Sequence, residues 1–115
     1  MALAFAPVLV WVPLAAAHAS LVRTMPDAGS AVRESPAKVR LSFSGPLEPA
    51  FSTVEVLDGS GKRVDKGDPQ VDGNDRQLLQ VSVPHLPVGT YRVMWRVLSV
   101  DRHVAKGDFT FNIAP

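Results

Sequence analysis

The sequence of residues 91–98 is YRVMWRVL, the clearest strand signal in the chain. Apolar side chains hold every second position, and two arginines and a methionine lie between them. The apolar set is Tyr91, Val93, Trp95 and Val97. Successive side chains of a β-strand point to opposite faces, so this alternation predicts one face in a core and one in solvent.

The same alternation recurs outward from this stretch in both directions. The segments are 39–43, 54–56, 79–83 and 109–113. Asp58-Gly59-Ser60-Gly61 predicts a reversal of the chain after the second of them. The polar residues 61–76 indicate an edge hairpin or a long loop facing solvent. Because no segment shows a helical repeat, we expect an all-β sandwich of about seven strands.

Composition narrows the class of protein further. The chain has 115 residues, a formal net charge of +1 and no cysteine. This length suits one domain, and the absence of cysteine excludes disulfide scaffolds and thiolate metal sites. The nearly balanced charge predicts no binding of nucleic acid through bulk electrostatics.

Residues 1–17 differ from the rest of the chain. They contain no charged side chain, whereas all 23 Lys, Arg, Asp and Glu residues follow them. An apolar run ending in Ala15-Ala16-Ala17 is typical of a secretory signal peptide, so we expect cleavage after Ala17 and an exported domain of residues 18–115. The alternatives are a buried N-terminal strand or an uncleaved anchor, and a natural start upstream of Met1, since no early basic residue is present.

Three residues form the candidate metal site. Cleavage after Ala17 would give His18 a free α-amine beside its imidazole, and Asp101 precedes His103 by two residues. Side chains at i and i+2 of extended backbone project to the same side, so Asp101 and His103 are expected to converge. Three nitrogens and one carboxylate oxygen favour one copper(II) ion, with zinc as the main competitor. An incidental pair of loop residues is the alternative interpretation.

Five ordered blocks resemble one known family. They are residues 18–22, HASLV; 26–30, PDAGS; 35–44, SPAKVRLSFS; 86–103, LPVGTYRVMWRVLSVDRH; and 107–111, GDFTF. Together they are similar to the CopC family of periplasmic copper-resistance proteins. The resemblance implies a Greek-key, immunoglobulin-like or cupredoxin-like β-sandwich. It also implies copper(II) ligation by His18, Asp101 and His103.

The chain departs from the family pattern in two places. Some members carry Glu directly after the Phe-Ser of the early strand, where this chain has Gly45, and whether Glu48 substitutes stays open. Some members bind copper(I) through a methionine-rich loop, but no Met lies between Met25 and Met94. We therefore predict one copper(II) ion and no separate copper(I) site. The remaining histidine of the exported domain, His85, is expected in an exposed loop between prolines.

The expected function is that of a non-enzymatic, monomeric copper(II) carrier or buffer of the periplasm, serving copper resistance or homeostasis. The resemblance implies a CopD-type membrane transporter as partner, here as a separate chain. One alternative is a metal-free immunoglobulin-like interaction module. A copper-dependent oxidative enzyme is the other, and the small size and the lack of an aromatic platform beyond Phe51 argue against it.

Overall fold

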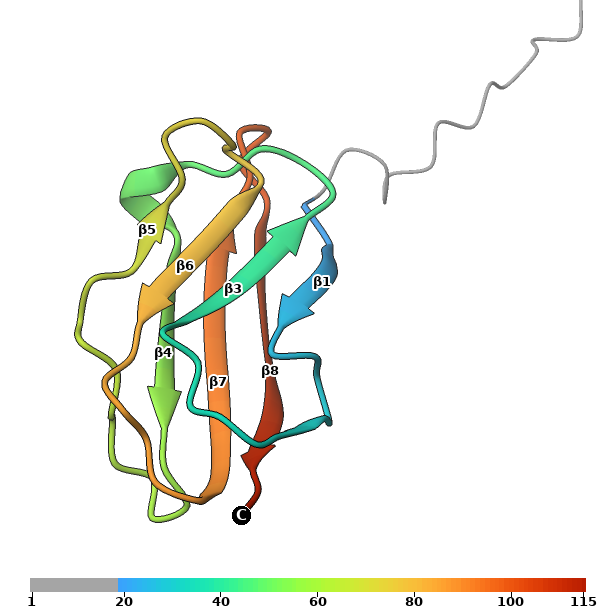
Figure 1. Ribbon diagram of the computed structural model, residues 1–115. Helices are drawn as coiled ribbons and strands as arrows, with labels where there is room; N and C mark the ends of the chain where they lie inside the picture. The colour runs from blue at the N-terminus through green and yellow to red at the C-terminus, as the bar shows by residue number, and fades with distance from the viewer. Residues whose placement is uncertain (1–18) are drawn as a thin grey trace, which may run out of the picture.

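Two four-stranded sheets face each other in the computed structural model, which describes residues 19–115 (Figure 1). The first sheet has the order β1(Leu21–Met25), β3(Lys38–Phe43), β6(Leu78–Ser82), β5(Gln70–Val71). The second has the order β2(Ala31–Val32), β8(Val104–Ile113), β7(Gly89–Leu98), β4(Thr53–Leu57). Only β2 and β8 among these neighbours run parallel. The predicted all-β sandwich is confirmed, and two of its eight strands are only two residues long.

The strand predicted from residues 91–98 is β7, and it lies inside the second sheet. β7 pairs with β8 over ten residues and with β4 on its other side. Tyr91, Val93 and Val97 are buried, as the alternation predicts. Trp95 is half-buried, with its ring edge-to-face on Phe43 of the opposite sheet at 5.2 Å between centroids. The inner faces of both sheets thus form one apolar core.

Gly107 lies opposite Trp95 in the pairing of β7 with β8. A Cβ at this glycine would lie 2.6 Å from Cζ2 of the Trp95 ring, which is closer than non-bonded atoms can approach. The indole therefore occupies the space that a side chain at position 107 would fill.

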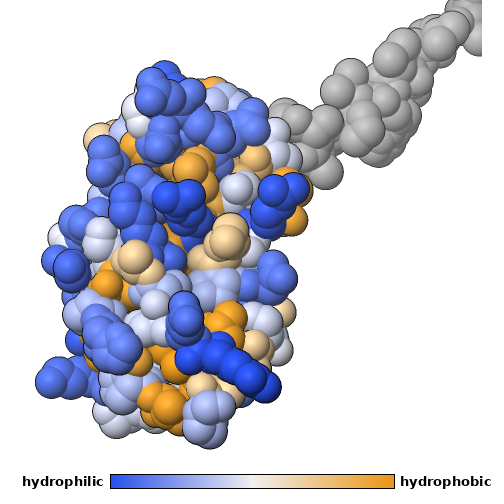
Figure 2. Space-filling model, in the orientation of Figure 1, coloured by the Kyte–Doolittle hydropathy of each residue, from blue (hydrophilic) through white to orange (hydrophobic). Residues whose placement is uncertain are grey.

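The outer face of the first sheet is polar. Lys38 and Arg40 of β3 are exposed and alternate with the buried Val39 and Leu41. Figure 2 shows hydrophilic residues over most of this side, with hydrophobic ones in small separate patches. Scattered apolar residues of this kind are ordinary on a protein surface. Within residues 19–115, no helix combines the length and apolar content needed to cross a membrane.

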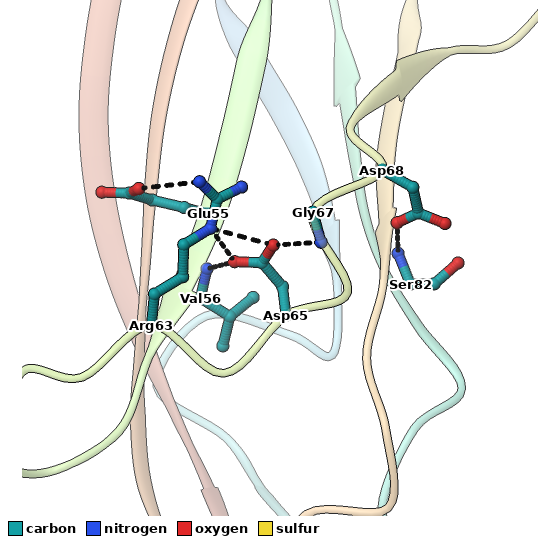
Figure 3. Close-up of polar contacts among 7 residues, drawn as sticks. All are labelled: Glu55, Val56, Arg63, Asp65, Gly67, Asp68 and Ser82. Atoms are coloured by element: carbon teal, nitrogen blue, oxygen red, sulfur yellow. Dashed lines mark hydrogen bonds and ion pairs between the residues drawn. The ribbon is translucent and has the colours of Figure 1, made fainter.

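The polar segment 61–76 follows the predicted reversal of the chain. The Asp58 amide donates to the Lys62 carbonyl at 2.8 Å, and residues 57 and 63 form a β-bridge, so the turn at 58–61 is confirmed. Beyond it, Asp65 accepts hydrogen bonds from the amides of Val56 and Gly67 and from Nε of Arg63 (Figure 3). β5 then pairs with β6 at the edge of the first sheet. The prediction of an edge hairpin or a long loop is confirmed, but its solvent-facing part is only partly right, because the Asp65 side chain and Val71 are buried.

One end of the sandwich gathers three segments that are distant in the sequence. The β7–β8 connection, the connection after β3 and the start of β1 all lie at this end (Figure 1). Ser20 and Ser44 are joined by two hydrogen bonds of 2.8 Å, one from each backbone amide. Leu47 bridges to Ser99, and the amide of Glu48 donates to the Leu98 carbonyl at 2.8 Å. The start of the described chain is thereby linked, through residues 44–48, to the β7–β8 connection.

Candidate metal centre

The β7–β8 connection, residues 99–103, is a tight hairpin loop. The amide of Arg102 donates to the Ser99 carbonyl at 2.9 Å, and the Ser99 amide donates to the His103 carbonyl at 3.0 Å. Arg102 has a φ of 69°. A β-turn followed by one residue in the left-handed region is a common three-residue hairpin connection. The loop conformation is therefore defined by two backbone hydrogen bonds and one left-handed residue.

This loop brings Asp101 and His103 together. Oδ2 of Asp101 lies 3.2 Å from Nδ1 of His103, and the two side chains are 30% and 52% exposed. The predicted convergence of the pair is confirmed. The predicted backbone conformation is wrong. Residues 100–102 form a turn and a bend, whereas extended backbone was expected. Reversal of the chain between the two residues brings the side chains to one point.

The separation of the two atoms suits a shared metal ion. Donor atoms about 2.0–2.2 Å from one ion, at angles of about 90–110°, lie about 2.8–3.6 Å apart. The observed 3.2 Å falls within this interval. The interval includes both tetragonal and tetrahedral arrangements, so the distance suits copper(II) and zinc equally. The choice between the two metals depends on the complete set of donor atoms.

The third predicted ligand, His18, lies outside the described residues. Its neighbour Ala19 is 3% exposed and belongs to the core. A Cβ placed at Gly45 would lie 3.9 Å from the Cα of Ala19, so the first described residue packs beside the connection after β3. That connection bonds to residues 98–100, next to the Asp101–His103 pair.

Neither Glu48 nor His85 groups with Asp101 and His103 as a metal cluster within residues 19–115. Within residues 19–115, no three His, Asp or Glu side chains are grouped as a metal site, so Glu48 does not complete a trio with Asp101 and His103. His85 is exposed in the connection before β7, whereas the Asp101–His103 loop follows the other end of that strand. The predicted position of His85 in an exposed loop is confirmed.

A third residue of this loop, Ser99, was not predicted from the sequence. It is 2% exposed, and its hydroxyl contacts both the Asp101 carboxylate and the backbone of His103. The available signal was the spacing Ser-x-Asp-x-His, in which a small hydroxyl residue precedes two candidate ligands at regular intervals. A serine in a turn is too common for that spacing alone to indicate a role.

Comparison with known proteins gives consistent matches. The CopC domain model matches residues 21–114. The "Copper transport protein CutJ" of Bacillus subtilis is 31% identical over 107 residues, covering 91% of this chain and 20% of that protein. The "Copper resistance protein C" of Escherichia coli is 36% identical over 107 residues, covering 86% of this chain and 83% of the relative. The chain thus spans one fifth of the first relative and most of the second.

Solved structures agree with the sequence matches. The crystal structure of CopC from Methylosinus trichosporium OB3b superposes with a TM-score of 0.80 at 39% identity. The match covers 85% of this chain and 95% of that one. Nearly the whole of that protein therefore has a counterpart in this chain.

Proposed function

This chain belongs to the CopC family, and on that premise we propose that it is an exported copper(II) carrier or buffer of the periplasm. It binds one copper(II) ion through His18, Asp101 and His103, and it serves copper resistance or copper homeostasis. The proposed activity is binding and delivery, without catalysis. Residues 1–17 act as a signal peptide whose removal creates the N-terminal ligand.

The observation that carries this proposal is the Asp101–His103 pair, with 3.2 Å between Oδ2 and Nδ1 in a partly exposed hairpin loop. The buried Ala19 is linked to the same end of the sandwich through residues 44–48. An α-amine and an imidazole from His18 would add two nitrogens to this pair. Such a set of nitrogen and oxygen donors favours copper(II) among the first-row divalent ions.

The named relatives support the same cargo. Three relatives that match at least 80% of their own length with this chain are called copper resistance protein C, and a much longer one is called a copper transport protein. We propose that the chain acts as a monomer and passes its ion to a CopD-type membrane transporter formed by a separate chain. Exposure of the pair at the end of a hairpin permits such a transfer, because a receiving ligand can approach from solvent.

The proposal is tested by titrating copper(II) against a chelator of known affinity. Two preparations are compared, one beginning at His18 and one with a single glycine before it. The added residue converts the His18 α-amine into an amide, leaves the imidazole in place and shifts the free amine by one residue, so the chelate of amine and imidazole within one histidine is lost. Trp95 is the sole tryptophan of residues 18–115 and gives a fluorescence readout.

We expect tight one-to-one binding in the first preparation and much weaker binding in the second. Weak binding in both would contradict the proposal and favour a metal-free interaction module. Equal, tight binding in both would contradict the role of the free N-terminus. A parallel zinc titration distinguishes the two metals, and preference for zinc would contradict copper as cargo.

A further inference from the structure

Ser99 lies at the base of the Asp101–His103 loop and is held by backbone contacts on two sides. It bridges to Leu47, its amide donates to the His103 carbonyl, and its carbonyl accepts from the Arg102 amide. The residue is 2% exposed. A hydroxyl at this depth has little access to water and depends on protein partners.

The hydroxyl of Ser99 has its partners among the candidate ligands themselves. It lies in hydrogen-bond contact with Oδ1 of Asp101, and it accepts from the His103 amide at 3.2 Å. The His103 carbonyl oxygen also lies 3.2 Å away. A hydroxyl has one hydrogen to donate, and the charged carboxylate is the stronger acceptor. The hydrogen is therefore assigned to Asp101, and the lone pairs serve the His103 amide.

From this arrangement we propose that Ser99 is a positioning residue for the copper site, an inference that rests on the function proposed above. Its hydroxyl engages Oδ1 of Asp101, which orients Oδ2 of the same carboxylate toward Nδ1 of His103. The same hydroxyl holds the backbone at His103. One buried group thus sets the orientation of one ligand and the backbone position of the other.

The physical consequence concerns the cost of ordering the ligands. Without the hydroxyl, the Asp101 carboxylate loses a hydrogen bond that restricts its rotation, and copper binding must then supply the ordering free energy. Loss of an outer hydrogen-bond partner of a metal ligand typically weakens metal binding about 10–100-fold. We expect Ser99→Ala to fall in this range.

Ser52 provides a matched control. It is also a buried serine, at 7% exposure, and its hydroxyl accepts from the Leu98 amide at 3.2 Å, one residue before Ser99. Ser52→Ala removes the same atom from the same end of the sandwich. No contact joins the Ser52 hydroxyl to Asp101 or His103 among the hydrogen bonds of residues 19–115.

The experiment compares the wild type, Ser99→Ala, Ser52→Ala and Ser99→Thr, all beginning at His18. Copper(II) affinity is measured by chelator competition, the copper environment by electron paramagnetic resonance, and folding by thermal unfolding of the metal-free proteins. We expect Ser99→Ala alone to lose affinity about 10–100-fold and to show an altered resonance spectrum. Ser99→Thr, which keeps a hydroxyl, should recover most of the affinity.

Three outcomes would overturn the inference. Ser99→Ala could bind as the wild type does, or both alanine variants could lose affinity equally, which would indicate general loosening of this end. A folded Ser99→Thr that binds as weakly as Ser99→Ala would also exclude the hydroxyl as the cause. A wild type that binds no copper would refute the proposed function itself, and the wild-type titration makes that failure distinct from the other three.

Discussion

Asp65 and Asp101 are two aspartates in connections between strands of the same sandwich, and their surroundings differ. The Asp65 side chain is completely buried, and both of its oxygens accept N–H groups, from Val56, Gly67 and Arg63 (Figure 3). The Asp101 side chain is 30% exposed, with one oxygen at the Ser99 hydroxyl and the other facing the His103 ring. Asp65 is surrounded by fixed backbone donors and one arginine, whereas Asp101 faces a side chain that can itself bind a metal.

This difference separates a structural carboxylate from a candidate ligand. Burial raises the pKa of the Asp65 carboxyl, but the hydrogen bonds from Arg63, Val56 and Gly67 outweigh burial and hold that pKa below its ordinary value. An ionised group with all its donors inside the protein stabilises the loop and has no route to an exchanging ion. The number of acidic residues in a segment is therefore a poor guide to metal binding.

The largest expected effect is on copper(II) binding at the partly exposed Asp101–His103 pair. His103→Ala removes one proposed ligand and should weaken copper(II) binding by more than about 100-fold, beyond the usual effect of losing an outer contact. Because the side chain is 52% exposed, the free energy of unfolding should change by only about 0.5 kcal/mol. Chelator competition and thermal unfolding measure the two quantities. The control is His85→Ala, and equal losses of affinity in both variants would contradict the site.

The second expected effect is on the stability that the buried Asp65 contributes. Asp65→Ala leaves three N–H donors without their acceptor and should lower the free energy of unfolding by about 2 kcal/mol at neutral pH. Copper(II) affinity should stay within about twofold of the wild type. Denaturant unfolding is the measurement, with the exposed Asp75→Ala as control. A loss of copper binding in Asp65→Ala would break the distinction between the two aspartates.

The pH dependence of this effect follows from the lowered pKa of Asp65. A carboxyl whose pKa is lower in the folded state stabilises the protein above its unfolded pKa of about 3.9. This contribution disappears as the pH falls through the lower, folded pKa. The difference between the wild type and Asp65→Ala should therefore be full above about pH 5 and shrink below about pH 4. A difference that grows on acidification would contradict the assignment.

The smallest expected effect concerns the backbone between the two candidate ligands. Arg102 has a φ of 69°, a region that costs residues with a Cβ about 1–2 kcal/mol. Arg102→Gly relieves this cost. It also makes the unfolded chain more flexible, which lowers the free energy of unfolding by about 0.5–1 kcal/mol. We expect a net gain near 0.5 kcal/mol in denaturant unfolding, unchanged copper affinity, and no gain for Arg102→Ala. A destabilised glycine variant would indicate that the Arg102 side chain stabilises the loop.

Much of the fold could be predicted because strand alternation is a local property. The apolar residues of 91–98 had to share one face, and the turn at Asp58 follows from residues that tolerate reversal of the chain. Trp95 was expected in the core and is half-buried with its ring against Phe43, since tryptophan is large and rarely fully buried. The candidate pair Asp101 and His103 was likewise found by spacing, although by the wrong backbone conformation.

The sequence by itself determined the class of fold, the family and the identity of the candidate ligands. The strands and the Asp101–His103 pair follow from residue types at short, fixed intervals, and His18 follows from the predicted cleavage after Ala17. Only the tertiary structure decided that a left-handed residue turns Asp101 toward His103, and that the buried Ser99 holds both. It also decided that the buried Asp65 accepts from the Val56 amide, nine residues away, as well as from Gly67 and Arg63. The burial of Ser99 and the hydrogen bond from Val56 to Asp65 arise from packing between separate segments, which no local pattern encodes. The contacts within residues 99–103 depend on the loop conformation, which the spacing of residue types leaves undetermined.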